Sequence, residues 1–128
     1  MTQSTRDLLL VATGGAAGAA ARYLVGRAMG PTADSAFPWH TFAINISGAF
    51  LIGLALVLAA RLGWPGWWRP LLAVGILCGY TTFSTLSLET VELLMRGQVA
   101  TGALYALGSL AAGLSAVAAG IWLGRLVA

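Results

Sequence analysis

Charged side chains are scarce in this chain of 128 residues, since Asp, Glu, Lys and Arg together make up 9% and lysine is absent. Hydrophobic residues account for 59%, and the mean hydropathy is +0.85. Soluble domains typically carry about 25% charged residues, which they need to keep their surfaces in water. The composition therefore excludes a small soluble domain and indicates an integral membrane protein.

Side chains suited to covalent or metal chemistry are also few. The chain has one cysteine, Cys78, so no intrachain disulfide can form, and no second histidine or acid stands at metal-ligand spacing from its one histidine, His40. Paired carboxylates, a Cys/His dyad and a nucleophile elbow are missing, so we do not expect an enzyme. The seven arginines are too scattered for a nucleic-acid surface, and no nucleic acid is expected as a partner.

Four long apolar stretches occupy most of the chain, at about residues 8–29, 41–60, 71–94 and 99–126. Each is long enough to cross a hydrocarbon core of about 30 Å as a helix, which requires about 20 residues. The connections between them are short and leave no room for a soluble domain. The sequence thus predicts an all-α membrane protein in which residues 1–128 form a single integral membrane domain with four transmembrane helices.

The arginines are divided almost evenly between the two sides of this predicted domain, and their distribution sets the orientation of a membrane protein. The side of the termini has four, and the other side has two, or three when Arg22, deeper in the first span, is counted: Arg6, Arg61, Arg69 and Arg125, against Arg27 and Arg96. Two interpretations stay open. The chain inserts in one orientation with a modest bias, or it inserts in both and pairs with its own inverted copy.

Polar residues also occur inside the spans, where a lipid-facing helix would not carry them. In the first span, Arg22 follows Gly14 and Gly18 at four-residue spacing, which predicts close helix packing beside an arginine. That arginine either snorkels to the interface or lies at the mouth of an anion pathway. In the second span, Thr41 and Asn45 share a face, and the amide serves either as interhelical glue or as a donor to an anion.

The role of a polar pair on the fourth span depends on which residues the pair faces. Tyr105 and Ser109 lie four residues apart on one face of the fourth span, but a serine can simply bond to its own helix backbone. His40 lies at the edge of the second span beside Trp39, where a solvated interfacial histidine is more common than a ligand.

The third span contains the unusual segment GYTTFSTLSLE at residues 79–89, with five hydroxyl side chains between Thr81 and Ser87. A run of β-branched threonines weakens a helix, and we expect the third helix to be broken at mid-membrane, from Cys78 to Thr82. Such a break is tolerated only where it is buried in protein or lines a cavity.

A break of this kind frees carbonyl oxygens and half-helix ends, which bind ions. The hydroxyl groups add hydrogen-bond donors, and Phe83 adds a ring with an electropositive edge. Donors with little fixed charge suit a small, strongly hydrated anion. The alternative is that the loosened helix is capped by its own threonine hydroxyls and binds nothing.

Three segments carry a resemblance to a known family: GGAAGAAARY at residues 14–23, NISGAFLIG at 45–53 and GYTTFSTLSLE. With the chain length and the four spans, they resemble the signatures of the Fluc, or CrcB, fluoride channels over nearly the whole chain. The resemblance implies a multi-pass protein of the cell inner (plasma) membrane that lets fluoride leave the cytoplasm passively. It also implies an antiparallel dual-topology homodimer with two pores, embedded in membrane lipid.

The resemblance further implies roles for individual residues. The positions that match the family's fluoride pathway are Asn45, Phe83, Ser84, Thr85, Tyr105, Ser109, Arg22, Thr41 and Glu89. It also implies a structural sodium ion (Na+) on the dimer axis, held by the backbone carbonyls of Cys78 and Thr81.

Three residues depart from the family's pattern. Leu86 stands where the family usually has a second phenylalanine, so one ring edge is lost from the expected fluoride site. Cys78 replaces a frequent glycine, although a carbonyl ligand survives that change unless the position needs a positive φ. Gly113 stands where some members continue a track of hydroxyls, so the track is shorter here or relies on water.

The main alternative is a small proton-coupled multidrug-type transporter, which also has four spans. Such a transporter needs an acid within the membrane to exchange protons for its substrate. The first span has no acid after Asp7, and Glu89 and Glu92 lie toward the end of the third. An accessory subunit is a further alternative, but it leaves the run of hydroxyls unexplained.

Overall fold

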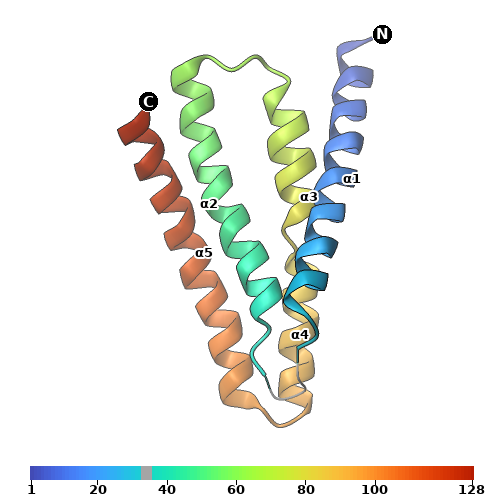
Figure 1. The fold of residues 1–128 in the computed structure, drawn as a ribbon, viewed down its shortest axis with the longest axis vertical. Helices are drawn as coiled ribbons and strands as arrows, with labels where there is room; N and C mark the ends of the chain where they lie inside the picture. The colour runs from blue at the N-terminus through green and yellow to red at the C-terminus, as the bar shows by residue number, and fades with distance from the viewer. Residues whose placement is uncertain (33–35) are drawn as a thin grey trace.

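The computed structural model describes residues 1–32 and 36–128, and within them every regular element is helical (Figure 1). The helices are α1 (Gln3–Met29), α2 (Trp39–Leu62), η1 (Arg69–Leu77), α3 (Cys78–Tyr80), α4 (Phe83–Met95) and α5 (Val99–Val127). Among the described residues, four helical segments are long and apolar enough to cross a membrane: α1, α2, the third span Arg69–Met95, and α5. The predicted all-α class with four spans is confirmed.

The helices extend beyond the apolar stretches because capping groups, and not the change in hydropathy, set their ends. Helix α1 begins five residues earlier than predicted, where the Thr2 hydroxyl accepts a hydrogen bond from the Thr5 N–H at 3.2 Å. Gly63 caps the C-terminus of α2. Its φ of 63° lies in the left-handed region that favours glycine, and the Gly63 N–H donates to the Ala59 carbonyl.

The four spans run alternately up and down, so the N-terminus, the C-terminus and the α2–η1 connection lie at the same end of the bundle (Figure 1). Helix α2 packs mainly against α5, and α1 packs against η1 and α3. At the shared end, the Arg61 side chain donates to the backbone carbonyl of Arg125 at 3.0 Å and joins the ends of α2 and α5.

Glycines allow the backbones of α1 and the third span to touch. Gly14 and Gly18 are buried, and a Cβ atom on Gly18 would collide with the carbonyl oxygen of Ile76 and lie 2.8 Å from the backbone nitrogen of Tyr80. The predicted close packing at these two positions is confirmed. Gly15 is different, because a Cβ there would meet nothing within 4 Å in the described part of the chain.

Candidate functional site

The third span is interrupted at two residues. Helix α3 ends at Tyr80, Thr81 and Thr82 adopt extended conformations (ψ of 158° and 115°), and α4 begins at Phe83. The predicted break from Cys78 to Thr82 was too wide, since Cys78 has helical angles (φ −70°, ψ −32°). The helix continues to Tyr80 because the Thr81 N–H still donates to the Leu77 carbonyl at 3.0 Å.

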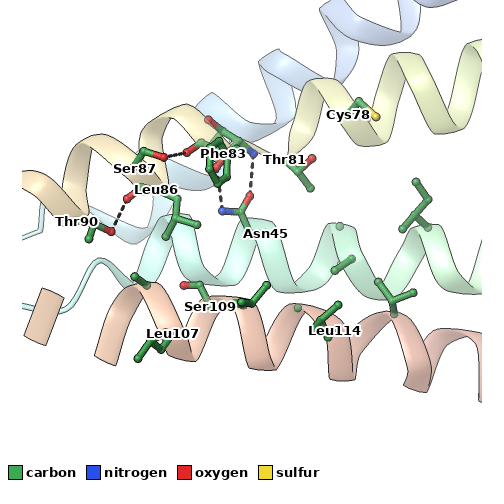
Figure 2. A pocket seen from close by; sticks show the side chains of 18 of the residues that line it. Asn45, Cys78, Thr81, Phe83, Leu86, Ser87, Thr90, Leu107, Ser109 and Leu114 are labelled. Carbon is green, nitrogen blue, oxygen red and sulfur yellow. Dashed lines mark hydrogen bonds between the residues drawn. The ribbon is translucent and has the colours of Figure 1, made fainter. Parts of the chain in front are cut away.

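Asn45 of α2 occupies the interruption. Its Nδ2 donates to the Thr82 carbonyl at 3.1 Å, and its Oδ1 accepts from the Thr82 N–H at 2.8 Å (Figure 2). One side chain thus satisfies both polar groups of a residue that has left the helix, which a buried interruption requires. An amide nitrogen has two hydrogens, so Asn45 has a second donor after this clamp is made.

Two backbone carbonyls lose their helical donors at the interruption. In a continuous helix the Thr82 N–H would donate to the Cys78 carbonyl, but it donates to Asn45. The Thr85 N–H would likewise donate to the Thr81 carbonyl, but it donates to the Thr82 hydroxyl at 3.2 Å. These are the two carbonyls to which the family resemblance assigns a cation.

The hydroxyls of this segment are not equivalent. Those of Thr81 and Ser87 donate to carbonyls one turn earlier, of Leu77 at 2.9 Å and Phe83 at 2.9 Å, and are therefore not donors for an anion. The Thr82 hydroxyl donates to Thr85 Oγ1 at 3.0 Å and lies 3.2 Å from Ser84 Oγ. Thr85, as the acceptor in that bond, keeps its own hydrogen for another partner.

A groove of about 790 Å³ runs along one side of the interruption, walled by α2, α4 and α5 (Figure 2). Asn45, Thr82, Phe83 and Leu86 line it, and Phe83 is 82% exposed in the isolated chain. Ser109 of α5 also lines the groove, and its buried hydroxyl oxygen has no hydrogen-bond partner among the described residues.

A second cavity, of about 340 Å³, lies between α1, α2 and the start of α4. Arg22, His40, Thr41, Thr82 and Thr85 line it. The Arg22 Nε is buried and lacks a partner within the described chain, so a positive donor borders this cavity. Thr82 also lines the groove, so it borders both hollows.

Glu89 of α4 connects α2 to α5. Its Oε1 accepts from the Thr41 hydroxyl at 3.0 Å and lies 3.3 Å from His40 Nε2, and its Oε2 accepts from the Tyr105 hydroxyl at 2.5 Å. Tyr105 is fully buried. The His40 side chain, predicted as a solvated interfacial histidine, is 25% exposed at the start of α2 and lies beside this carboxylate.

The structure therefore brings the predicted site residues together in separate sets. Asn45, Phe83 and Ser109 line the groove, whereas Arg22, Thr41 and Thr85 line the second cavity. Glu89 of α4 and Tyr105 of α5 are hydrogen-bonded to each other, and Ser84 is exposed at the start of α4.

Sequence reasoning did not place Thr82 or His40 in the site. The only signal for Thr82 was its place in the hydroxyl run, and nothing in the sequence distinguished its backbone as the partner of Asn45.

Comparison with known proteins identifies relatives over nearly the full chain. Residues 9–121 match the family described as CrcB-like protein, Camphor Resistance (CrcB). The fluoride-specific ion channel FluC of Nitrobacter winogradskyi is 46% identical over 121 residues, covering 94% of this chain and 96% of that protein. The FluC proteins of Agrobacterium fabrum and Thermus thermophilus are 48% and 49% identical, and cover 93% and 83% of this chain and 96% and 85% of their own lengths.

Proposed function

The chain belongs to the CrcB family, whose curated relatives are fluoride-specific ion channels, and we propose that it conducts fluoride passively out of the cytoplasm. The proposed path runs along the interruption of the third span, where Asn45 bonds to Thr82. It is a multi-pass plasma-membrane protein with four spans. Its relatives are named as ion channels, which are not enzymes, and family membership gives no support to a proton-coupled multidrug-type transporter.

One observation carries the proposed path: within the described part of the chain, each of the two hollows that Thr82 borders is also lined by a residue with a buried, unpartnered polar atom. Ser109 lines the groove and Arg22 lines the second cavity, and the Ser109 Oγ and Arg22 Nε atoms are both buried. A buried donor without a partner costs about 1–3 kcal/mol, which an anion offsets by accepting from it. Fluoride is small and strongly hydrated, so hydroxyl and amide donors have to replace its water, and Asn45 and Thr85 each keep one hydrogen for this.

We also propose that a second, inverted copy of the chain completes two pores. The support is the groove itself, which is open on one side in the isolated chain, and the aromatic ring of Phe83 that projects into it. Exposed leucines of α5, Leu107, Leu110 and Leu114, line its far wall. An inverted partner would cover these apolar side chains and place its own Phe83 beside the pathway, and the weak arginine bias permits both orientations.

The proposed antiparallel homodimer predicts that the chain is found in both orientations in one membrane. Arg96→Cys in a Cys78→Ala background places the one thiol at the α4–α5 turn. We expect impermeant maleimide to label about half of the protein from each side, because inverted copies pair one to one. Labelling from one side alone would contradict the antiparallel dimer.

We further propose that a structural sodium ion binds at the interruption of the third span in this dimer. The Cys78 and Thr81 carbonyls have lost their helical donors, and carbonyl oxygens are ligands that hard cations accept. Among the described residues no group of three His, Cys, Asp or Glu side chains could hold a metal, so a cation here depends on the backbone. When bound, the ion would supply positive charge that neutralises the carbonyl dipoles of two facing chains and stabilises their association.

The central prediction is fluoride flux without chloride flux. We expect liposomes containing the purified protein to release fluoride under a potassium diffusion potential and to retain chloride, with no imposed pH gradient. The physical reason is that fixed donors match a small anion and leave a larger one poorly coordinated. An ion-selective electrode measures each release. Equal release of both anions would contradict the channel's selectivity, and release that requires a pH gradient would favour a transporter.

A further inference from the structure

The connection between α1 and α2, at the end of the bundle opposite the termini, runs into α2 through the tripeptide Phe37–Pro38–Trp39 (Figure 1). Pro38 has φ −74° and ψ 71°, the angles of an inverse γ-turn, and the Trp39 N–H donates to the Phe37 carbonyl at 2.8 Å. A proline ring fixes φ, so few other conformations are open to this turn. The backbone of Phe37 is therefore held in a defined position beside the first residue of α2.

The ring of Phe37 is packed among three other aromatic rings. Its centroid lies 4.5 Å from the Trp39 ring in a tilted arrangement, and 5.5 Å from the Phe42 ring at an interplanar angle of 70°. The third contact is with Tyr105 of α5, at 5.2 Å and 82°. Edge-to-face pairs at such distances are an arrangement that aromatic side chains prefer. The turn before α2 thus carries an aromatic contact to the fourth span.

The Tyr105 ring that Phe37 contacts also carries a hydroxyl bonded to α4. This hydroxyl donates to Glu89 Oε2 at 2.5 Å, and the Thr41 hydroxyl donates to Oε1 at 3.0 Å. The hydroxyl is at the far end of the ring, and a hydrogen bond weakens steeply away from its preferred distance and angle, so the tilt of the ring decides whether the bond forms. Tyr105 is fully buried, so neighbouring side chains, Phe37 among them, fix that tilt.

The bond between Tyr105 and Glu89 matters to a passing anion because it disperses the charge of a carboxylate. Hydrogen bonds to a charged acceptor are stronger than those between neutral groups. Both residues match the proposed fluoride pathway through the family resemblance, and Ser109, one turn beyond Tyr105 on α5, lines the groove. A carboxylate that loses one of its hydroxyl donors repels fluoride more strongly, so a well-placed Tyr105 hydroxyl favours passage.

We propose that Phe37 is a positioning residue for fluoride passage, whose ring seats Tyr105 so that the tyrosine hydroxyl stays on Glu89. In the described part of the chain, neither the groove nor the second cavity is lined by Phe37, so it acts through Tyr105 and not by contact with the ion. The connection between the first two spans thus has a task in the pathway besides joining two helices. This inference rests on the proposed channel function.

A double-mutant cycle of fluoride release from liposomes tests this role. We expect Phe37→Leu to lower the flux by about two- to tenfold, the range that corresponds to losing one ring–ring contact. Tyr105→Phe removes the hydroxyl and should lower the flux at least as much. When Phe37→Leu is added to Tyr105→Phe, the flux should not fall further, because no hydroxyl is left to position. A ring that only supports folding would instead lower the flux by the same factor in both backgrounds.

Matched variants separate positioning from general loss of stability. Phe37→Tyr keeps the ring and should retain wild-type flux. Phe50→Leu removes a half-buried ring elsewhere on α2 and should retain it as well. Thermal melting in detergent reports stability, which Phe37→Leu should lower by the same amount with and without the Tyr105 hydroxyl. If Phe37→Leu is not recovered as a folded protein, Phe37→Met takes its place in the cycle, because a flexible methionine fills the space of the ring.

The outcomes distinguish this inference from the function on which it rests. Equal flux loss from Phe37→Leu in both backgrounds, or an equal loss in Phe50→Leu, would overturn the positioning role. Wild-type flux in Phe37→Leu or in Tyr105→Phe would overturn it too, while leaving the channel function intact. A wild-type protein that releases no fluoride would overturn the channel function and this inference with it.

Discussion

Replacing Asn45 with aspartate is expected to abolish fluoride flux while leaving a folded protein. Aspartate has the same shape and keeps the oxygen that accepts from the Thr82 N–H at 2.8 Å. It replaces the nitrogen that donates to the Thr82 carbonyl at 3.1 Å with a second oxygen, and it puts a negative charge beside the path of an anion. Two like charges about 4 Å apart repel by about 4 kcal/mol at an effective dielectric of 20, or roughly a thousandfold in rate.

The measurement is fluoride release from liposomes that contain equal amounts of each protein. Asn45→Leu is the matched variant, because it removes both hydrogen bonds without adding charge. We expect it to lower thermal stability, since both polar groups of Thr82 lose their partner at about 1–3 kcal/mol each. Leu86→Phe is the positive control, because it restores a ring on the groove wall beside Phe83 and should leave flux intact or raise it. Wild-type flux in Asn45→Asp would place the pathway elsewhere.

Replacing Gly18 with valine is expected to destabilise the fold strongly. Even a Cβ at this position would collide with the Ile76 carbonyl oxygen and lie 2.8 Å from the Tyr80 nitrogen, and both are backbone atoms that no rotamer change can move. Helix α1 would have to separate from η1 and α3, directly beside the interruption. Overpacking typically costs about 1–3 kcal/mol and more where backbone atoms collide, so valine should lower the melting temperature by about 10 °C or more, or abolish expression.

Gly15→Ala is the control on the same helix, one turn earlier. A Cβ there meets nothing within 4 Å in the described chain, and alanine is about 1 kcal/mol better than glycine inside a helix. We expect this variant to be as stable as the wild type or slightly more so. The two variants are compared by yield of folded protein and by thermal melting in detergent. Similar stability for Gly18→Val and Gly15→Ala would show that α1 does not pack against the third span as described.

Much of this protein could be predicted from the sequence, because a membrane span is a local property. About 20 consecutive apolar residues bury their backbone polar groups only as a helix, so four such stretches predict four helices whatever the rest of the chain does. The spacing of Gly14 and Gly18 predicted a close helix contact for the same reason, since the requirement is only that a side chain be absent. The run of threonines after Gly79 likewise indicated where the third helix is weakest.

The extent of the interruption and the composition of the site were decided by tertiary structure. The interruption involves Thr81 and Thr82 because Asn45, 37 residues away, supplies the hydrogen bonds that the helix gives up. Glu89 is placed by Thr41, 48 residues away, and by Tyr105, 16 residues away, and the same carboxylate lies 3.3 Å from His40 Nε2. The burial of apolar side chains in lipid has no preferred direction, so composition alone predicts it. A hydrogen bond instead requires one particular donor and one particular acceptor about 3 Å apart. Only the packing of α2 against α4 and α5 brings these atoms together.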